Sequence, residues 1–199
     1  AFSLGLILVI VAGAELFTGN NLLVMAWVQR QVPTGALLRN WTVVYAANFV
    51  GAAGLAVLVY LSGQWQMADG ALGEAAVKIA TGKASLPFGE LFFRGVLCNI
   101  LVCLAVWLCF AGRSVIDRVA AIIFPITAFV ALGYEHSVAN MYFFSVGLLL
   151  KEKVGVEAGS LDAGGVVANL IPVTLGNIVG GGVMVALVAL PAYAAHLIR

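Results

Sequence analysis

The chain has 199 residues, of which 63% are hydrophobic and only 10% are charged, and its formal net charge is +1. A soluble domain has about 45–50% apolar and about 25% charged residues, so this composition excludes an ordinary soluble protein and indicates a helical membrane protein. The near-neutral charge, with no basic cluster, gives no reason to expect nucleic acid as a partner.

Five apolar windows are each long enough for a membrane-spanning helix, which needs about 20 residues. In chain order they are Ala1–Val28, Trp41–Ser62, Leu91–Ala111, Val119–Leu150 and Gly164–Ala195. The first window has no basic segment in front of it and is too long for a signal peptide. The sequence therefore predicts an all-α, polytopic membrane protein.

The segments between the windows differ in charge. Segments 29–40 and 112–118 contain arginines with Asp117 as their one acid, whereas 63–90 and 151–163 mix lysines with acids. Raw counts of Lys and Arg nearly tie, but the positive-inside rule applies to short loops. We therefore expect the arginine segments on the cytoplasmic side of a multi-pass protein in the cell's inner membrane.

Two pairs of segments form an internal repeat. Residues 13–24 (GAELFTGNNLLV) and 133–144 (GYEHSVANMYFF) share the pattern G-x-E-x-x-x-x-N. Residues 40–51 (NWTVVYAANFVG) and 169–180 (NLIPVTLGNIVG) share N-x-x-x-V-x-x-x-N-x-V-G. A full unit of three crossings makes such a repeat inverted in the membrane. Inverted repeats with broken helices that meet at the midplane are a known transporter design.

We interpret residues 1–199 as one membrane channel domain, with 1–62 as the remainder of the first repeat, 63–90 as a connecting loop and 91–199 as the second repeat. The window Leu91–Ala111 has no counterpart in the first repeat. We therefore expect an N-terminally truncated version of a six-helix plan, without the first helix of the parent.

The repeat also predicts where helices break and where they pack closely. We expect interruptions near Ala1–Leu6 and just before Gly133. Gly176 and Gly180 are four residues apart, and Gly51 holds the repeat position of Gly180. Small residues at this spacing let helix backbones approach closely, so these positions predict helix contacts.

The fourth window contains Glu135 and His136 side by side. A charged side chain at the bilayer centre costs at least about 2.5–3.5 kcal/mol, so it normally faces a polar interior and marks a pathway. Glu15 repeats Glu135, which suggests that each carboxylate accepts hydrogen bonds from backbone N–H groups freed at a helix break. His136 has no counterpart, because Leu16 holds its repeat position, and we expect His136 to line the pathway.

Metal chemistry and catalysis are not expected. The three cysteines, Cys98, Cys103 and Cys109, are spaced by five and six residues, so they share no ligand face and are interpreted as packing residues. A catalytic zinc needs three protein ligands, and the only other histidine is His196. We predict no cofactor and no enzymatic activity.

Several stretches resemble the formate–nitrite transporter family: AGAELFTG (12–19), LCNILVCLAVW (97–107), GYEHSVAN (133–140) and IPVTLGNIVGGG (171–182). The last of these and AGRSVID (111–117) are most similar to the formate channels. The resemblance implies an aquaporin-like protomer of six helices, two of them broken. It also implies a homopentamer in the lipid membrane with one pore per protomer, which passes formate, nitrite or hydrosulfide.

The resemblance also implies roles for individual residues. The family's central histidine falls on His136 and its partner threonine on Thr18, its pore asparagines on Asn99 and Asn177, and its pore-mouth lysine on Lys83. Its two hydrophobic constrictions fall on two sets of three residues: Phe2, Leu6 and Phe129, and Leu16, Phe17 and Val102.

We hypothesise that Lys83 and backbone dipoles attract a small monovalent anion, formate first, which is then hydrogen-bonded or protonated at His136. Imidazole suits this role because its unperturbed pKa is about 6.5. A neutral acid would then cross the hydrophobic constrictions at a lower desolvation cost than an anion. Nitrite and hydrosulfide remain alternatives, as does a neutral-solute channel for water or glycerol, although the chain has no NPA-type motif.

Overall fold

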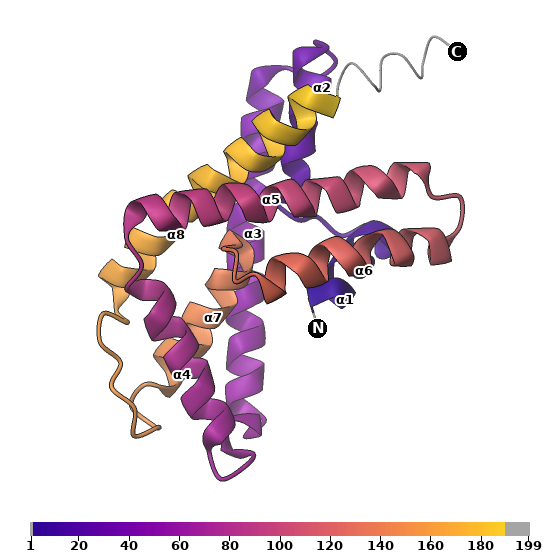
Figure 1. Ribbon diagram of the computed structural model, residues 1–199. Coiled ribbons are helices and arrows are strands. Elements are labelled where there is room, and N and C mark those ends of the chain that lie inside the picture. Colours follow the sequence, from indigo (N-terminus) through magenta and orange to yellow (C-terminus); the bar gives the residue numbers. More distant parts are fainter. Residues whose placement is uncertain (1, 190–199) are drawn as a thin grey trace.

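The computed structural model describes residues 2–189, and every regular element in that range is a helix (Figure 1). The elements in chain order are α1 (Phe2–Ala12), η1 (Gly19–Leu22), α2 (Leu23–Val28), α3 (Thr34–Leu61), η2 (Gln64–Gln66), α4 (Ala71–Ala84), α5 (Phe88–Ala111), α6 (Val115–Ala131), α7 (Ser137–Leu150), α8 (Ala163–Ile178) and the π-helix η3 (Val179–Leu187). The predicted window Gly164–Ala195 is therefore described only to residue 189, and His196 lies outside the described residues.

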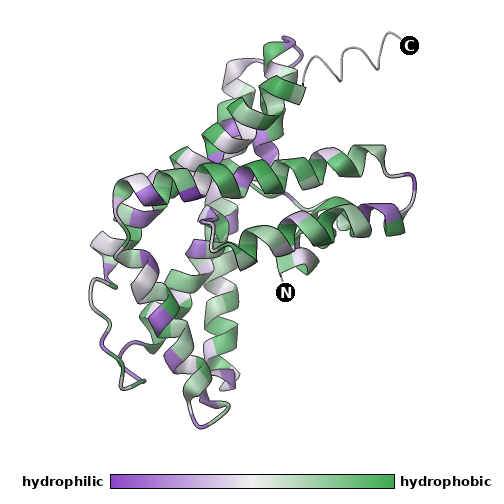
Figure 2. Ribbon diagram, viewed as in Figure 1, coloured by the Kyte–Doolittle hydropathy of each residue, from purple (hydrophilic) through white to green (hydrophobic). Residues whose placement is uncertain are grey.

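Within residues 2–189, three continuous helical stretches are long and apolar enough to cross a membrane: α3, α5, and α8 together with η3. Large apolar side chains lie exposed along them, and Figure 2 shows that most of the helical ribbon is hydrophobic, with hydrophilic residues in the connecting turns and at some positions within helices. A soluble protein rarely exposes apolar surface so extensively. The predicted all-α membrane fold is confirmed.

Both predicted broken helices are present, but one break lies elsewhere than expected. The helix α1 runs unbroken over Phe2–Ala12, so the expectation of a break near Ala1–Leu6 is wrong. The break begins instead at Gly13, where φ is +75°, and its repeat counterpart Gly133 has φ of +65°. Glycine adopts this left-handed conformation at little cost. The break before α7 is where the sequence predicted it, because α6 ends at Ala131.

The segment 63–90, expected to be a connecting loop, contains the 14-residue helix α4. Its sequence is rich in alanine, which favours helix formation, and this propensity explains why the segment is helical. Gly73, Val77 and Ala80 form its buried face at helical spacing. This face packs against α7 and fixes the position of Lys83 in the last turn of α4.

The tightest helix contact is the crossing of α5 with α8 and η3. A Cβ added at Gly95 would lie 2.8 Å from the carbonyl oxygen of Val173, and at Gly176 and Gly180 it would collide with backbone carbonyls of α5. The close packing predicted from these two glycines is confirmed. Gly51, at the repeat position of Gly180, has no neighbouring atom within 4 Å of its added Cβ.

This asymmetry yields a paired prediction. Gly180→Ala forces the added methyl group against the Val96 carbonyl, and backbone cannot rotate away as a side chain can. Overpacking costs about 1–3 kcal/mol of stability, so we expect a severe loss of folded protein. Gly51→Ala makes the same chemical change in open space and is the control. The measurement is detergent-solubilised yield and thermal unfolding midpoint, and equal effects of the two variants would contradict the prediction.

Candidate functional site

Each helix break is held by one asparagine that bridges the main chain on both sides of a single residue. Asn48 accepts a hydrogen bond from the Phe17 N–H and donates one to the Glu15 carbonyl, both at 3.0 Å. Asn177 accepts from the Ser137 N–H at 2.9 Å and donates to the Glu135 carbonyl at 3.0 Å. In hydrocarbon these main-chain groups have no water as a partner, so the side chains of Asn48 and Asn177 supply the hydrogen bonds that they would otherwise lack.

A second pair of asparagines holds the side chains of the repeated glutamates. The Asn20 amide donates to Glu15 Oε2 and to Asn40 Oδ1. The second half has the same arrangement, made by the residues at the corresponding repeat positions: Glu135, Asn140 and Asn169. The repeat is therefore present in the hydrogen bonding as well as in the sequence.

In the second half, the Asn140 amide donates to Glu135 Oε2 at 2.6 Å and to Asn169 Oδ1 at 2.8 Å. The prediction that the carboxylates accept backbone N–H groups is wrong. A carboxylate can only accept, whereas an amide both donates and accepts, so an asparagine is the side chain that can bridge an N–H and a C=O. These asparagines are fixed letters of the repeat, but the sequence predicts a functional role only for Asn177.

The second half differs from the first by a buried ion pair. Lys83 Nζ lies 2.7 Å from Glu135 Oε1, and the two side chains are only 17% and 3% exposed. The Lys83 carbonyl also accepts from the Asn169 amide at 2.9 Å, which fixes the residue through its main chain. Glu15 is exposed, and no Lys or Arg within residues 2–189 pairs with it.

His136 and Thr18 meet between the two breaks, as the resemblance implied. His136 Nε2 lies 2.9 Å from Thr18 Oγ1, and both residues are buried. The other ring nitrogen, Nδ1, accepts the Ala139 N–H at 3.1 Å, which makes His136 the N-cap of α7. A nitrogen that accepts holds a lone pair, so the neutral ring has its hydrogen on Nε2. His136 therefore donates to the threonine hydroxyl.

The two asparagines expected to line a pore both bond to main-chain groups. Asn99 is fully buried on α5, and its amide donates to the Thr18 carbonyl at 3.2 Å and to the Asn177 carbonyl at 2.7 Å. The side-chain amide of Asn177 also donates to the Gly95 carbonyl at 2.8 Å. The geometry makes both residues part of the framework around His136.

The first predicted constriction set lies beside His136. The ring of Phe2 packs edge-on against Phe129, with centroids 5.9 Å apart, and Phe129 stacks on the His136 ring at 5.8 Å. Leu6 and Phe129 are buried in the same apolar cluster. One face of the imidazole is therefore covered by apolar side chains.

The second predicted set is divided between two neighbourhoods. Leu16 packs against the apolar cluster that contains Val102. Phe17 is buried too, but its ring lies against the rings of Trp41 and Tyr45 on α3, with centroids 6.1 and 4.9 Å away.

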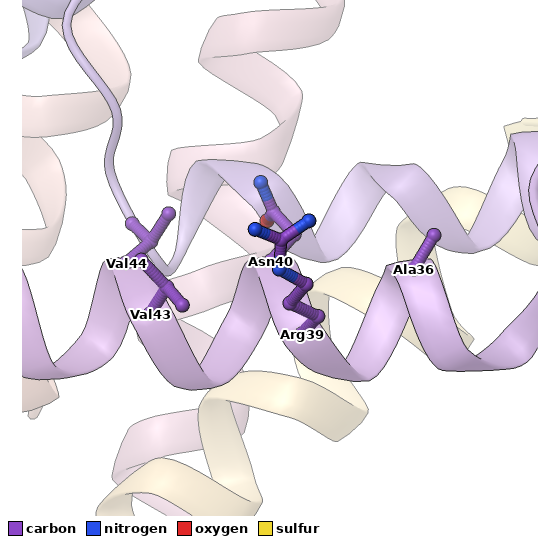
Figure 3. Close-up of a pocket in the computed structure, with 5 residues that line it drawn as sticks. All are labelled: Ala36, Arg39, Asn40, Val43 and Val44. Carbon is purple, nitrogen blue, oxygen red and sulfur yellow. The ribbon is translucent and has the colours of Figure 1, made fainter.

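Two surface cavities lie apart from these residues. One, of about 270 Å³, is lined by Arg39 and Asn40 with apolar residues of α3, and Figure 3 shows the two polar side chains close together. The other, of about 340 Å³, is an almost entirely apolar groove beside Tyr45 and α8. None of the predicted site residues lines either cavity. Within residues 2–189, no cluster of three His, Cys, Asp or Glu side chains could hold a metal ion.

The fold and the two asparagine-held breaks define an α-helical membrane protein of the broken-helix transporter class. The sequence profile of the family described as "Formate/nitrite transporter" matches residues 1–190, and the chain belongs to this family. It is 41% identical over 196 residues to the formate channel FocA of Haemophilus influenzae, an alignment that covers 92% of this chain and 69% of that protein.

Two further comparisons agree. The chain is 40% identical over 198 residues to the formate channel FocA of Escherichia coli K12, with 94% of this chain and 70% of that protein covered. A solved structure described as a pentameric formate channel with formate bound matches with a TM-score of 0.81 and 38% identity, over 96% of this chain and 80% of that one. The resemblance to the formate channels is confirmed.

The buried ion pair gives a prediction on stability. Lys83→Met leaves Glu135 buried without its cation, and removing one partner of a buried pair costs about 3–5 kcal/mol. The double variant Lys83→Met/Glu135→Gln removes both charges and should recover a large part of the loss. The measurement is thermal unfolding of the purified protein.

The exposed pair on the same helix is the control. Lys78 and Glu74 are 3.4 Å apart with side chains 63% and 46% exposed, so Lys78→Met should change the midpoint little. If Lys83→Met is as mild as Lys78→Met, the buried pair does not stabilise the fold.

Proposed function

We propose that the protein is a channel for small monovalent weak-acid anions, formate first, with one pore in each protomer of a homopentamer in the cell's inner membrane. The relatives are formate channels by name, and a similar solved structure is described as pentameric with formate bound. The role is transport rather than catalysis. The observation that supports it most directly is the buried hydrogen bond between Thr18 and His136 at the junction of the two breaks.

The proposed binding step uses the threonine hydroxyl. Because His136 Nε2–H donates to Thr18 Oγ1, the hydroxyl hydrogen of Thr18 is available for another acceptor. A formate oxygen would receive that hydrogen bond, polarised by the imidazole behind it, and hydrogen bonds in such chains strengthen one another. The N-terminus of α7, which starts at Ser137, adds a positive dipole end toward the same point.

Full proton transfer from His136 is the less favoured form of this mechanism. A neutral imidazole that gave up its Nε2 hydrogen would become an anion inside the membrane. The doubly protonated ring could give up a proton, but its second hydrogen would sit on Nδ1 and face the Ala139 N–H. While that cap is intact, we propose that His136 acts on the anion as a hydrogen-bond donor through Thr18.

In this proposal Lys83 attracts the anion less strongly than an unpaired lysine would. Its charge lies 2.7 Å from a carboxylate, so the pair presents a dipole rather than a free cation. The apolar rings of Phe2 and Phe129 exclude water beside His136 in this proposal, which strengthens the hydrogen bonds that the anion receives there.

The function is tested by flux in liposomes that contain the purified protein, with formate, nitrite, hydrosulfide and glycerol as solutes. We expect formate to cross fastest, with slower flux of the other two weak-acid species and none of glycerol above protein-free liposomes. Faster nitrite or hydrosulfide would reassign the substrate within the same class. Glycerol flux without anion flux would overturn the proposal.

The Thr18–His136 pair is tested by three variants. His136→Asn keeps a good N-cap for α7 but loses the Nε2 donor to Thr18, and it has no Nδ1 whose protonation would break the bond from the Ala139 N–H. We therefore expect folded protein with lower formate flux, and without the pH dependence that protonation of Nδ1 gives the wild type. Thr18→Val removes the hydroxyl at constant shape and should lower formate flux about tenfold or more, a loss of about 1.4 kcal/mol. Thr18→Ser keeps the hydroxyl and is the control. Wild-type rate and pH profile in both His136→Asn and Thr18→Val would make the pair a packing contact.

A further inference from the structure

Thr18 and His136 belong to a closed ring of hydrogen bonds. The Thr18 carbonyl accepts from Asn99, whose amide also donates to the Asn177 carbonyl. The Asn177 side chain bonds to the two peptide groups that flank His136, those of Glu135 and Ser137. The Nε2–Oγ1 contact between His136 and Thr18 then closes the ring. The main chain and the side chain of His136 are therefore fixed by one set of bonds.

The Asn177 carbonyl of this ring lies where the helix type changes at the end of α8. The α-helix ends at Ile178 and the π-helix η3 follows, so the backbone pairing changes from the fourth to the fifth residue along the chain. At the junction the Asn177 carbonyl accepts two side-chain amides, from Asn99 at 2.7 Å and from Asn21 at 3.4 Å. Short π-helical turns inside helices are frequent at functional sites.

Gly181, in this π-helix, faces the groups that hold Thr18. A Cβ added at Gly181 would collide with the Asn99 amide nitrogen, and it would lie 2.7 Å from Cys103 Sγ and 2.9 Å from Asn21 Cβ. Cys103 is fully buried, and its thiol donates to the same Thr18 carbonyl at 3.3 Å. Both donors to that carbonyl therefore occupy space that any side chain at position 181 would need.

We propose that Gly181 and Cys103 are positioning residues for the Thr18–His136 pair. Thr18 lies at the end of a helix break and its side chain caps no helix, so its carbonyl is held in place by Asn99 and Cys103. Holding the carbonyl orients the hydroxyl toward His136 Nε2. This inference rests on the proposed role of that pair in conduction, and it adds residues that contact neither the imidazole nor the permeant.

The central experiment compares two alanine substitutions in the same π-helix. Gly181→Ala displaces the side-chain ends of Asn99 and Cys103, which then release Thr18, and its methyl group also presses on Asn21 Cβ. Gly182→Ala has the same intrinsic effect on the helix, but its Cβ meets only Val24 Cγ2 at 3.2 Å and Asn21 O at 3.8 Å. Formate flux is measured in liposomes between about pH 5 and pH 8, the range in which histidine titrates.

We expect Gly181→Ala to lower formate flux about tenfold, equivalent to about 1.4 kcal/mol, and to change its pH profile. Gly182→Ala should stay within about twofold of wild type with an unchanged profile, since its added methyl group displaces no hydrogen-bonding partner. Equal effects of the two variants at matched protein density would overturn the inference. A wild-type protein without formate flux would instead overturn the proposed function, so the two failures are distinguishable.

Variants at Cys103 decide the inference even if Gly181→Ala fails to fold. Cys103→Ala removes the donor without adding volume and should lower flux by about twofold to fivefold, the size expected for one weak hydrogen bond. Cys103→Ser restores a hydroxyl donor to the Thr18 carbonyl and should recover flux to near wild type. Equal flux in Cys103→Ala, Cys103→Ser and wild type would show that the thiol only fills space and would overturn its assigned role.

Discussion

A helix that stops inside a membrane leaves peptide N–H and C=O groups without partners, and each such group costs several kcal/mol in hydrocarbon. The part of the chain that the structure describes contains two such stops, at Gly13 and at Gly133. Asn48 and Asn177 each satisfy one stop from a neighbouring helix, and they do so with the same pair of bonds. The placement of the glutamates, of Thr18 and of His136 follows from these two anchors.

The two halves use the same anchor for different purposes. In the second half, Lys83 neutralises the buried Glu135, and the position after the glutamate is a histidine that caps α7. In the first half, the corresponding position is Leu16, and the hydroxyl of Thr18 faces across to the histidine. A symmetric scaffold thus places one titratable ring and one hydroxyl side by side.

Much of this was predictable from the sequence because it depends on local chemistry. Hydrophobic length predicted the membrane-spanning helices, and the repeated G-x-E-x-x-x-x-N pattern predicted the break at Gly133. The same pattern contains Gly13, where the other break lies, but the sequence prediction of that break near Ala1–Leu6 is wrong. The helix α4 was missed because its mixed composition looked like a connecting loop. The pairing of Lys83 with Glu135 was the least predictable feature. The two residues are 52 positions apart in the sequence, and no spacing rule encodes their contact.

The state of the His136 ring is the most direct test, because the capping bond to Ala139 determines what His136 can give to an anion. It can be measured by solid-state NMR of the assembled protein with ¹⁵N-labelled histidine, using the spectrum of His136→Asn to assign the signals. We predict that near neutral pH Nε2 carries the hydrogen and Nδ1 is an unprotonated acceptor. A ring with its hydrogen on Nδ1, or on both nitrogens, would contradict a role for His136 as a donor through Thr18.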